Sequence, residues 1–415
     1  MSTVFARLVA TLAAVCSLLY LAPGNHPPDS RVIDVGTVAE LYAAAESEAN
    51  RHVTVRVRPG TYVLTRPLRL QQGMHLSGRN RYQDVDRDGV WDQLPGGGWV
   101  VRDETTLDAR KMTPVRALTH DCNAGGITFE NQEPAIVLGS GTRVSGITVR
   151  APGDGAGIGE GINPSVAPTA VVEDSVIEGG RRAVALGNVG CTARRFKSTL
   201  TFEQNIVVGS RTGLTLANFV SDRDGIVEGP TIVATIRRNR FEDNETGLSI
   251  QGGLQGTDGG IVEVISVENR FEHNAGGGIV IRAGTSQPAA PGASANGNRV
   301  RFFSTSDTIQ SSGTAAMTII GSDRLETNGT TGGENDANQV EAHIVNANIE
   351  GSSVGILAVG GRYRGADPAA KAGSANVVTL VLRAAGRPPV SIQTADDSPT
   401  PAVRINPANR VVIIR

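Results

Sequence analysis

Aromatic residues, lysine and net charge are all scarce in this chain of 415 residues. Aromatic side chains make up 4% of it, the formal net charge is −2, and lysine supplies few of the 39 basic residues. A near-neutral chain offers no basic field for a phosphate backbone, so we exclude nucleic acid as a partner. Because arginine provides nearly every positive charge, exposed cations would suit carboxylate or sulfate groups.

Long apolar runs are absent except at the N-terminus. There, one run extends from Leu8 to Leu21, follows the single cation Arg7 and ends at Pro23-Gly24. It is short for a membrane span and typical of a secretory signal. We expect residues 1–24 to be a signal peptide or an uncleaved anchor, with no membrane span beyond them. The protein is then secreted, periplasmic or held at the cell surface.

Cysteine is equally rare, with three in the chain. Loss of the N-terminal segment would leave Cys122 and Cys191. In an oxidising compartment these two either form one disulfide or remain as buried thiols.

What the chain does contain is glycine, 51 residues of it, together with short apolar stretches that alternate with polar residues. One short helix is predicted from Thr37 to about Ala49, because Thr37 and Glu40 have the spacing of a capping box. Alternating strands follow, joined by the turn Arg58-Pro59-Gly60-Thr61-Tyr62 and leading into Leu76-Ser77-Gly78. This helix, "PGTY" turn and "LSG" strand resemble the N-terminal cap of the pectate-lyase-like superfamily, which implies an all-β, right-handed parallel β-helix solenoid.

A repeated phrase beginning near Val171 supports the solenoid. It reads strand, polar turn residue, short strand, second turn and short strand, and it occurs six times. Aligned on the first turn, the polar residues that fall in register are Ser175, Asn205, Asn239, Asn269, Ser306 and Asn348. We interpret them as a structural ladder of side chains that bond from coil to coil.

The last strand of each phrase would line the groove if the likeness to pectate lyases extends to the substrate face. Period-two alternation points one set of residues into the core: Leu214, Leu216, Leu248, Ile250, Ile279, Ile281, Met317 and Ile319. It points another set outward: Ala185, Thr215, Ser249, Val280, Thr318 and Leu357. The outward set contains no carboxylate, which argues against pectate-lyase chemistry. Polar loops that follow these strands are expected to gather along one edge. The few candidates for stacking on a sugar are Phe219, Phe241 and Tyr363.

The sharpest motif is an acidic loop with the pattern D-x-D-x-D-G-x-x-D. Its predicted calcium ligands are Asp84, Asp86, Asp88, the carbonyl of Val90 and Asp92. Carboxylates at alternate positions converge on one hard cation, and Gly89 permits the sharp turn. The loop resembles calcium loops of EF-hand, dockerin and thrombospondin-repeat proteins, although Pro95 stands where an EF-hand has its bidentate glutamate. We expect a structural calcium that holds an insertion between the first coils.

Candidate catalytic residues are of two kinds. Hydrolysis requires two carboxylates, for which Asp222, Asp224 and Asp258 are candidates on neighbouring loops. Elimination requires a base, for which Arg182 and Arg238 are candidates.

The sequence thus predicts an N-terminal segment (1–24), a linker (25–36) and one β-helix domain (37–415). Within the domain, residues 37–110 form the cap and first coils with the calcium-loop insertion, 111–385 the coils with long loops, and 386–415 a C-terminal cap. Two functions remain open. One is binding or processing of a polysaccharide by a lyase, hydrolase or epimerase; the other is a non-catalytic surface or adhesion protein that binds a glycan or another protein. The oligomeric state is not indicated.

Overall fold

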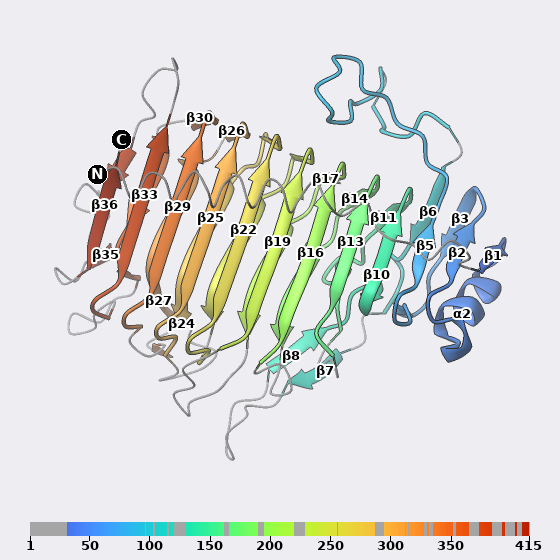
Figure 1. The fold of residues 1–415 in the computed structure, drawn as a ribbon, viewed down its shortest axis with the longest axis horizontal. Coiled ribbons are helices and arrows are strands. Elements are labelled where there is room, and N and C mark those ends of the chain that lie inside the picture. The colour runs from blue at the N-terminus through green and yellow to red at the C-terminus, as the bar shows by residue number, and fades with distance from the viewer. Residues whose placement is uncertain are drawn as a thin grey trace, which may run out of the picture.

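The computed structural model describes residues 31–414, apart from 96, 103, 114–115, 120–128, 162–165, 190–194, 220–228, 255, 287–293, 312, 314, 328–329, 332–334, 352–353, 365–372, 384–391, 395–402 and 405–408. These residues form the predicted right-handed parallel β-helix, in which three long sheets run along the molecule (Figure 1). The N-terminal segment, Cys122, Cys191, Asp222 and Asp224 lie outside the described residues. No helix among the described residues is long and apolar enough to span a membrane.

Sheet A has twelve strands and contains the first strand of every coil. Its strands are β1 (Val32–Val35), β2 (Thr54–Val57), β5 (His75–Ser77), β10 (Ser140–Ser145), β13 (Thr169–Glu173), β16 (Lys197–Glu203), β19 (Thr231–Arg237), β22 (Ile261–Val267), β25 (Arg299–Thr305), β29 (Gln339–Val345), β33 (Val377–Arg383) and β36 (Arg410–Ile414). Strand β1 lies inside the segment predicted as a linker, because its short apolar alternation pairs with β2.

Sheet B has nine shorter strands. They are β3 (Gly60–Val63), β6 (Thr105–Asp108), β11 (Thr148–Arg150), β14 (Val176–Glu178), β17 (Ile206–Val208), β20 (Arg240–Glu242), β23 (Arg270–Glu272), β26 (Thr308–Ser311) and β30 (Asn348–Gly351).

Sheet C closes each coil. Its strands are β4 (Leu68–Arg69), β9 (Ile136–Leu138), β12 (Ala156–Glu160), β15 (Arg182–Val189), β18 (Thr212–Phe219), β21 (Thr246–Leu254), β24 (Gly277–Ser286), β27 (Ala315–Thr327), β31 (Val354–Val359) and β34 (Ile392–Thr394). Three short strands, β28 (Thr330–Thr331), β32 (Arg362–Arg364) and β35 (Val403–Arg404), extend it beyond the coil, and β7 (Arg116–Thr119) pairs with β8 (Phe129–Gln132) separately.

Helix α2 (Val38–Glu46) covers the N-terminal end of the solenoid and is followed by the 3-10 turn η1 (Glu48–Asn50). The capping box is present as predicted: the Glu40 backbone N–H donates to Thr37 Oγ1, and the Thr37 N–H donates to Glu40 Oε2. Leu41 and Ala45 are fully buried against the first coil. The helix therefore shields the apolar interior that an open coil would expose to water.

Alternation within the strands places the core as expected. All eight predicted inward residues of sheet C are fully buried, and those on adjacent strands are register partners, as in Leu214–Leu248 and Ile279–Met317. Aromatic rings stack between coils in the same way, with Phe241 and Phe271 at 4.7 Å and nearly parallel. Each coil buries apolar side chains at the same positions, so one apolar column extends through the molecule.

The polar ladder is confirmed for its first four members. Asn205 and Asn239 each donate from backbone N–H and side-chain Nδ2 to the Oδ1 of the next asparagine, at 2.9 to 3.1 Å. Asn269 donates in the same way to Asp307, not to Ser306. A second ladder, not predicted, joins Asn298, Asn338, Asn376 and Asn409.

Ser306 and Asn348 were therefore placed wrongly in the ladder. In each coil the residue before the ladder position takes a left-handed conformation, and Ser306 has this role at φ 58°. Asp307 then occupies the ladder position. In the next coil Asn346 turns at φ 52°, Ala347 occupies the ladder position, and Asn348 begins β30. Two adjacent positions both favour small polar residues, so an alignment by residue type slips by one.

Candidate functional site

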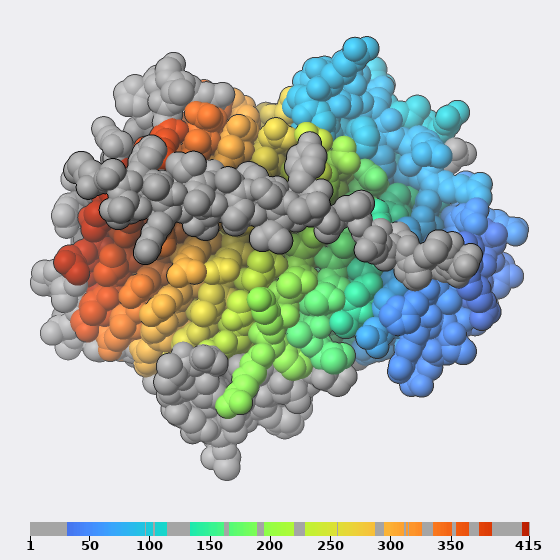
Figure 2. All heavy atoms as spheres, viewed as in Figure 1, coloured from blue at the N-terminus to red at the C-terminus, as the bar shows by residue number. Residues whose placement is uncertain are grey.

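Residues 78–104, here called the insertion, leave the coils between β5 and β6 and fold back over sheet B (Figures 1 and 2). Trp99 packs against Val176 and Ile206 of two successive coils. The Arg240 guanidinium lies 5.5 Å from the centroid of the Trp99 ring, and Tyr82 stacks on Trp91 at 5.4 Å. Both tryptophans of the chain thus serve to attach the insertion to the solenoid.

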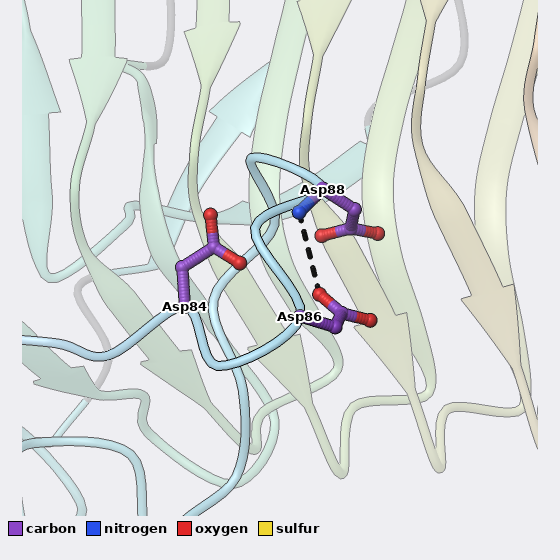
Figure 3. Close-up of side chains that lie close together, drawn as sticks. All are labelled: Asp84, Asp86 and Asp88. Atoms are coloured by element: carbon purple, nitrogen blue, oxygen red, sulfur yellow. Dashed lines mark hydrogen bonds between the residues drawn. The ribbon is translucent and has the colours of Figure 1, made fainter.

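The acidic loop forms the tip of the insertion. Asp84, Asp86 and Asp88 each bring a carboxylate oxygen within 4.8 Å of the others (Figure 3). The loop is closed by its own backbone: the Gly89 N–H donates to Asp84 Oδ2 at 3.0 Å and the Val90 N–H to Asp88 Oδ1 at 2.8 Å. Gly89 has φ 84°, and a Cβ there would lie 2.9 Å from the Arg238 side chain. Glycine is required both for the turn and for this close approach.

A cation from a distant coil already lies against two of these carboxylates. Arg270 of β23 donates through Nη2 to Asp86 Oδ2 at 2.9 Å and to Asp88 Oδ2. The hydrogen bond from Arg270 lowers the pKa of Asp86. Arg270 therefore favours the ionised form of Asp86 and balances part of the negative charge of the loop.

Some of the oxygen atoms of the loop are placed to bind a hard cation, and others are not. Asp84 Oδ1 is buried and has no hydrogen-bond partner, so one carboxylate oxygen at the centre of the loop is left over. Oxygen donors at this spacing are those that calcium prefers. Asp92, however, is drawn away, since its Oδ2 accepts from the Val85 N–H at 2.6 Å.

The structure does not bring the candidate catalytic residues together within the part of the chain that it describes. Asp258 accepts from the backbone N–H of Asn296 at 2.7 Å and so fixes a turn. Arg238 donates to Glu268 at 2.8 Å, and this bond raises its pKa, which opposes a role as a base.

Arg182 behaves differently, because burial, assisted by Arg181 and Arg211, lowers its pKa to about 10. Its side chain makes no hydrogen bond or ion pair with a described residue. A base for elimination also needs a cation or acid to stabilise the substrate carbanion. The charged groups that affect the pKa of Arg182 are the cations Arg181 and Arg211, and no described carboxyl group is among them.

The predicted groove on sheet C is more closed than expected. The outward residues are register partners from Ala185 to Leu357, as predicted, but Thr215, Ser249 and Val280 expose 8% or less of their surface. The proposed sugar-stacking residues are also wrong: Phe241 and Tyr363 are fully buried and Phe219 nearly so. Large rings are the best filling for a coil interior, and a chain poor in aromatics uses them there.

A more open row, missed in the sequence, runs along sheet A. It consists of Val171, Thr201, Thr235, Ile265, Phe303, His343 and Val381, which are register partners on seven successive strands. All but the last are half-buried. Phe303 and His343 stack with ring centroids 4.9 Å apart. The sequence does contain a signal for this row, because apolar and polar residues alternate in the first strand of each repeated phrase.

Charged side chains border this row, which we call the sheet A row. On one side Arg301 donates to Glu263 at 2.8 Å, and Glu341 pairs with His343 at 2.7 Å. On the other, Arg237 donates to Glu203 at 2.9 Å. The face thus combines an apolar and aromatic centre with polar margins, a composition found in ligand sites.

Comparison with known proteins adds little. No protein-family model and no curated protein matches the chain. Among solved structures, the catalytic domain of a GH87 alpha-1,3-glucanase in complex with tetrasaccharides gives a TM-score of 0.34 at 10% identity, covering 95% of this chain and 70% of that one. The same domain type in complex with nigerose gives 0.30 at 11% identity, with the same coverage. A likeness at this level carries no inference about activity.

Proposed function

We propose that the protein binds an extended polysaccharide along the sheet A row. The observation that carries this proposal is the stacked pair Phe303 and His343, set among half-buried apolar and threonine side chains. The apolar face of a sugar ring packs well on an aromatic ring, while its hydroxyl groups need polar partners. Arg301, Glu263 and Glu341 offer such partners at the margin.

The repeat of the solenoid also suits a polymer. Successive strands of a sheet lie about 4.8 Å apart, which is close to the length of one sugar residue in an extended glycan. Each coil can therefore present the same kind of surface to one successive sugar. Repetition of weak contacts along a stacked surface is the way solenoid proteins bind extended partners.

Binding without cleavage fits the geometry better than catalysis. Among the candidates that the structure describes, Asp258 is held in a turn and Arg238 in an ion pair. Arg182 is held in neither, but no described carboxylate pairs with it to serve as an acid. We further infer export, on the strength of the N-terminal apolar segment alone, so the polysaccharide would be one met outside the cytoplasm.

The test is affinity electrophoresis of the full chain on acidic and neutral polysaccharides, with release of unsaturated or reducing ends assayed in parallel. Phe303→Ala should weaken binding about tenfold, since it removes an aromatic platform. Leu357→Ala, an outward residue of sheet C, is the matched control and should bind as wild type. Retardation by no polysaccharide would overturn the proposal, and so would a loss in Leu357→Ala alone. Release of products would favour the lyase, hydrolase or epimerase alternative.

We also propose that the acidic loop binds a structural calcium ion. Asp84, Asp86 and Asp88 would hold it, together with the Val90 carbonyl. Asp92, whose Oδ2 accepts from the Val85 N–H, would act through its other oxygen or through a water molecule. The unpartnered Oδ1 of Asp84 supports this. Calcium would supply positive charge at the point where Arg270 now provides it, so the ion and the guanidinium would compete for Asp86 and Asp88.

A further inference from the structure

A second group of charges lies where sheet C extends beyond the coil. Asp323 of β27 is fully buried, and three arginines surround it: Arg282 of β24 and Arg362 and Arg364 of β32. Together they donate five hydrogen bonds to its two oxygens, at 2.8 to 3.2 Å. Arg362 and Arg364 each bind it through Nε and Nη2, in the bidentate geometry typical of strong guanidinium–carboxylate pairs. We call these four residues the arginine group.

The arginine group carries more positive than negative charge. Three guanidiniums face one carboxylate, and the charged groups that affect the pKa of Arg282 are the other three members of the group. Burial lowers the pKa of Arg282, and repulsion from Arg362 and Arg364 adds to this against the attraction of Asp323. Burial would raise the pKa of Asp323, but the three guanidiniums outweigh it and lower that pKa. The repulsion among the arginines is therefore only partly relieved by Asp323.

Donors remain available after Asp323 is satisfied. A guanidinium has five N–H groups, and no arginine of the group uses more than two on Asp323 or any on another described residue. The side chains of Arg282, Arg362 and Arg364 expose 22%, 14% and 40% of their surface, so the group is shielded from water yet open on the side of Arg364.

Two polar atoms beside the group also lack partners. Thr285, the register partner of Asp323 on β24, has a buried Oγ1 without a hydrogen bond. Gln251, the register partner of Arg282 on β21, has a buried Oε1 without a hydrogen bond. Register partners in a parallel sheet point to the same side, so both groups face the arginines.

We propose that the arginine group is a binding site for an oxyanion, the carboxylate or sulfate group of a ligand. The anion completes a set of donors that one carboxylate leaves partly unused, and it neutralises the surplus charge. Planar guanidiniums in fixed positions select oxygen anions with paired acceptors over halide, which offers none. This site is on sheet C and does not depend on polysaccharide binding by sheet A.

The experiment measures the melting temperature of the full chain against sodium sulfate, sodium galacturonate and glucose, with sodium chloride holding ionic strength constant. Saturable stabilisation by sulfate, galacturonate or both supports the site, and the response identifies which oxyanion it prefers. Arg364→Gln removes the most exposed arginine and should weaken the apparent affinity about tenfold. Arg364→Lys keeps the charge but not the bidentate geometry and should give an intermediate affinity.

Arg110→Gln is the matched control, because it removes an ion-paired arginine that belongs neither to the arginine group nor to the sheet A row, and it should leave the anion response unchanged. The proposal is overturned if neither anion shifts the melting temperature beyond the chloride and glucose values. It is equally overturned if Arg364→Gln, still folded, responds as strongly as wild type. Failure of polysaccharide binding with a retained anion response would reject the sheet A proposal and leave this one standing.

Discussion

The acidic loop and the arginine group are opposites in charge and in burial. In the acidic loop, Arg270 pairs with two of three clustered aspartates, and these two, Asp86 and Asp88, expose 52% and 34% of their side chains. In the arginine group, three arginines face one aspartate that is fully buried. Water screens the surplus charge of the loop, whereas the arginine group has only protein around its centre. The surplus charge of the arginine group should therefore affect the free energy of unfolding more than the surplus charge of the acidic loop does.

Removal of the one carboxylate from the arginine group should lower the free energy of unfolding by the largest amount. Asp323→Asn leaves three partly buried guanidiniums without an anion, and we expect a loss of about 3–5 kcal/mol in the free energy of unfolding. Chemical denaturation would measure it. Sulfate should restore stability more strongly in Asp323→Asn than in wild type, because an added anion takes the place of the carboxylate. A loss below about 1 kcal/mol would show that the group is not a buried network at all.

An intermediate change in stability is expected from substitution of Asp174, another acidic residue near the insertion. Burial, together with Glu173 and Glu203, raises its pKa to about 6. Between the ordinary pKa and this value the folded chain holds a proton that the unfolded chain has released, so stability falls as pH rises through that window. Asp174→Asn removes this loss. It should be about 1–2 kcal/mol more stable than wild type above pH 6, and equal to it at the acid end of the window.

The matched control for Asp174 is Asp243→Asn. Asp243 is also an aspartate in the left-handed conformation, at φ 54° against 46° for Asp174, but it is exposed. Asparagine tolerates this backbone geometry, so neither substitution strains the turn. A pH-independent gain in Asp174→Asn, or the same gain in Asp243→Asn, would contradict the assignment.

The smallest change in stability is expected from substitution of Arg270, which binds two carboxylates of the acidic loop. Arg270→Gln should cost about 1 kcal/mol or less without calcium, since the carboxylates it leaves are exposed. Calcium should raise the melting temperature of this variant more than that of wild type, because no guanidinium competes for Asp86 and Asp88. Asp86→Ala should abolish the calcium response. Thermal unfolding with and without chelator would decide, and an absence of any calcium response in wild type and Arg270→Gln would reject the metal site.

The fold could be predicted because its signals are local. Alternation along each strand fixed the inward residues of sheet C, and the capping box of Thr37 and Glu40 fixed the start of the helix. The predicted ladder was displaced by one residue at Ser306, because the turn position and the ladder position favour the same residue types. Burial of Tyr363 could not be inferred, because it depends on where the short strand β32 lies beside β27.

The candidate sites could not be predicted in full, because they bring together residues that are far apart in the sequence. The aspartates of the acidic loop stand at alternate positions in one short segment and were recognised, but Arg270 is 184 residues away from Asp86 in the sequence. Arg282, Asp323 and Arg362 lie on neighbouring strands separated by loops of different length, so their meeting follows from the register of the coils alone. The Phe303 and His343 stack has the same origin.

The contact between Arg270 and the insertion has a consequence for how the molecule comes apart. A solenoid in which each coil touches only its neighbours behaves as a one-dimensional array, and its ends can fray independently of its middle. The insertion leaves an early coil and contacts coils far along the stack, at Val176, Ile206, Arg240 and Arg270. It thereby acts as a strap across the array. Fraying from the N-terminal end must break the strap before it can proceed, so the coils from the first to that of β23 should unfold as a single cooperative block.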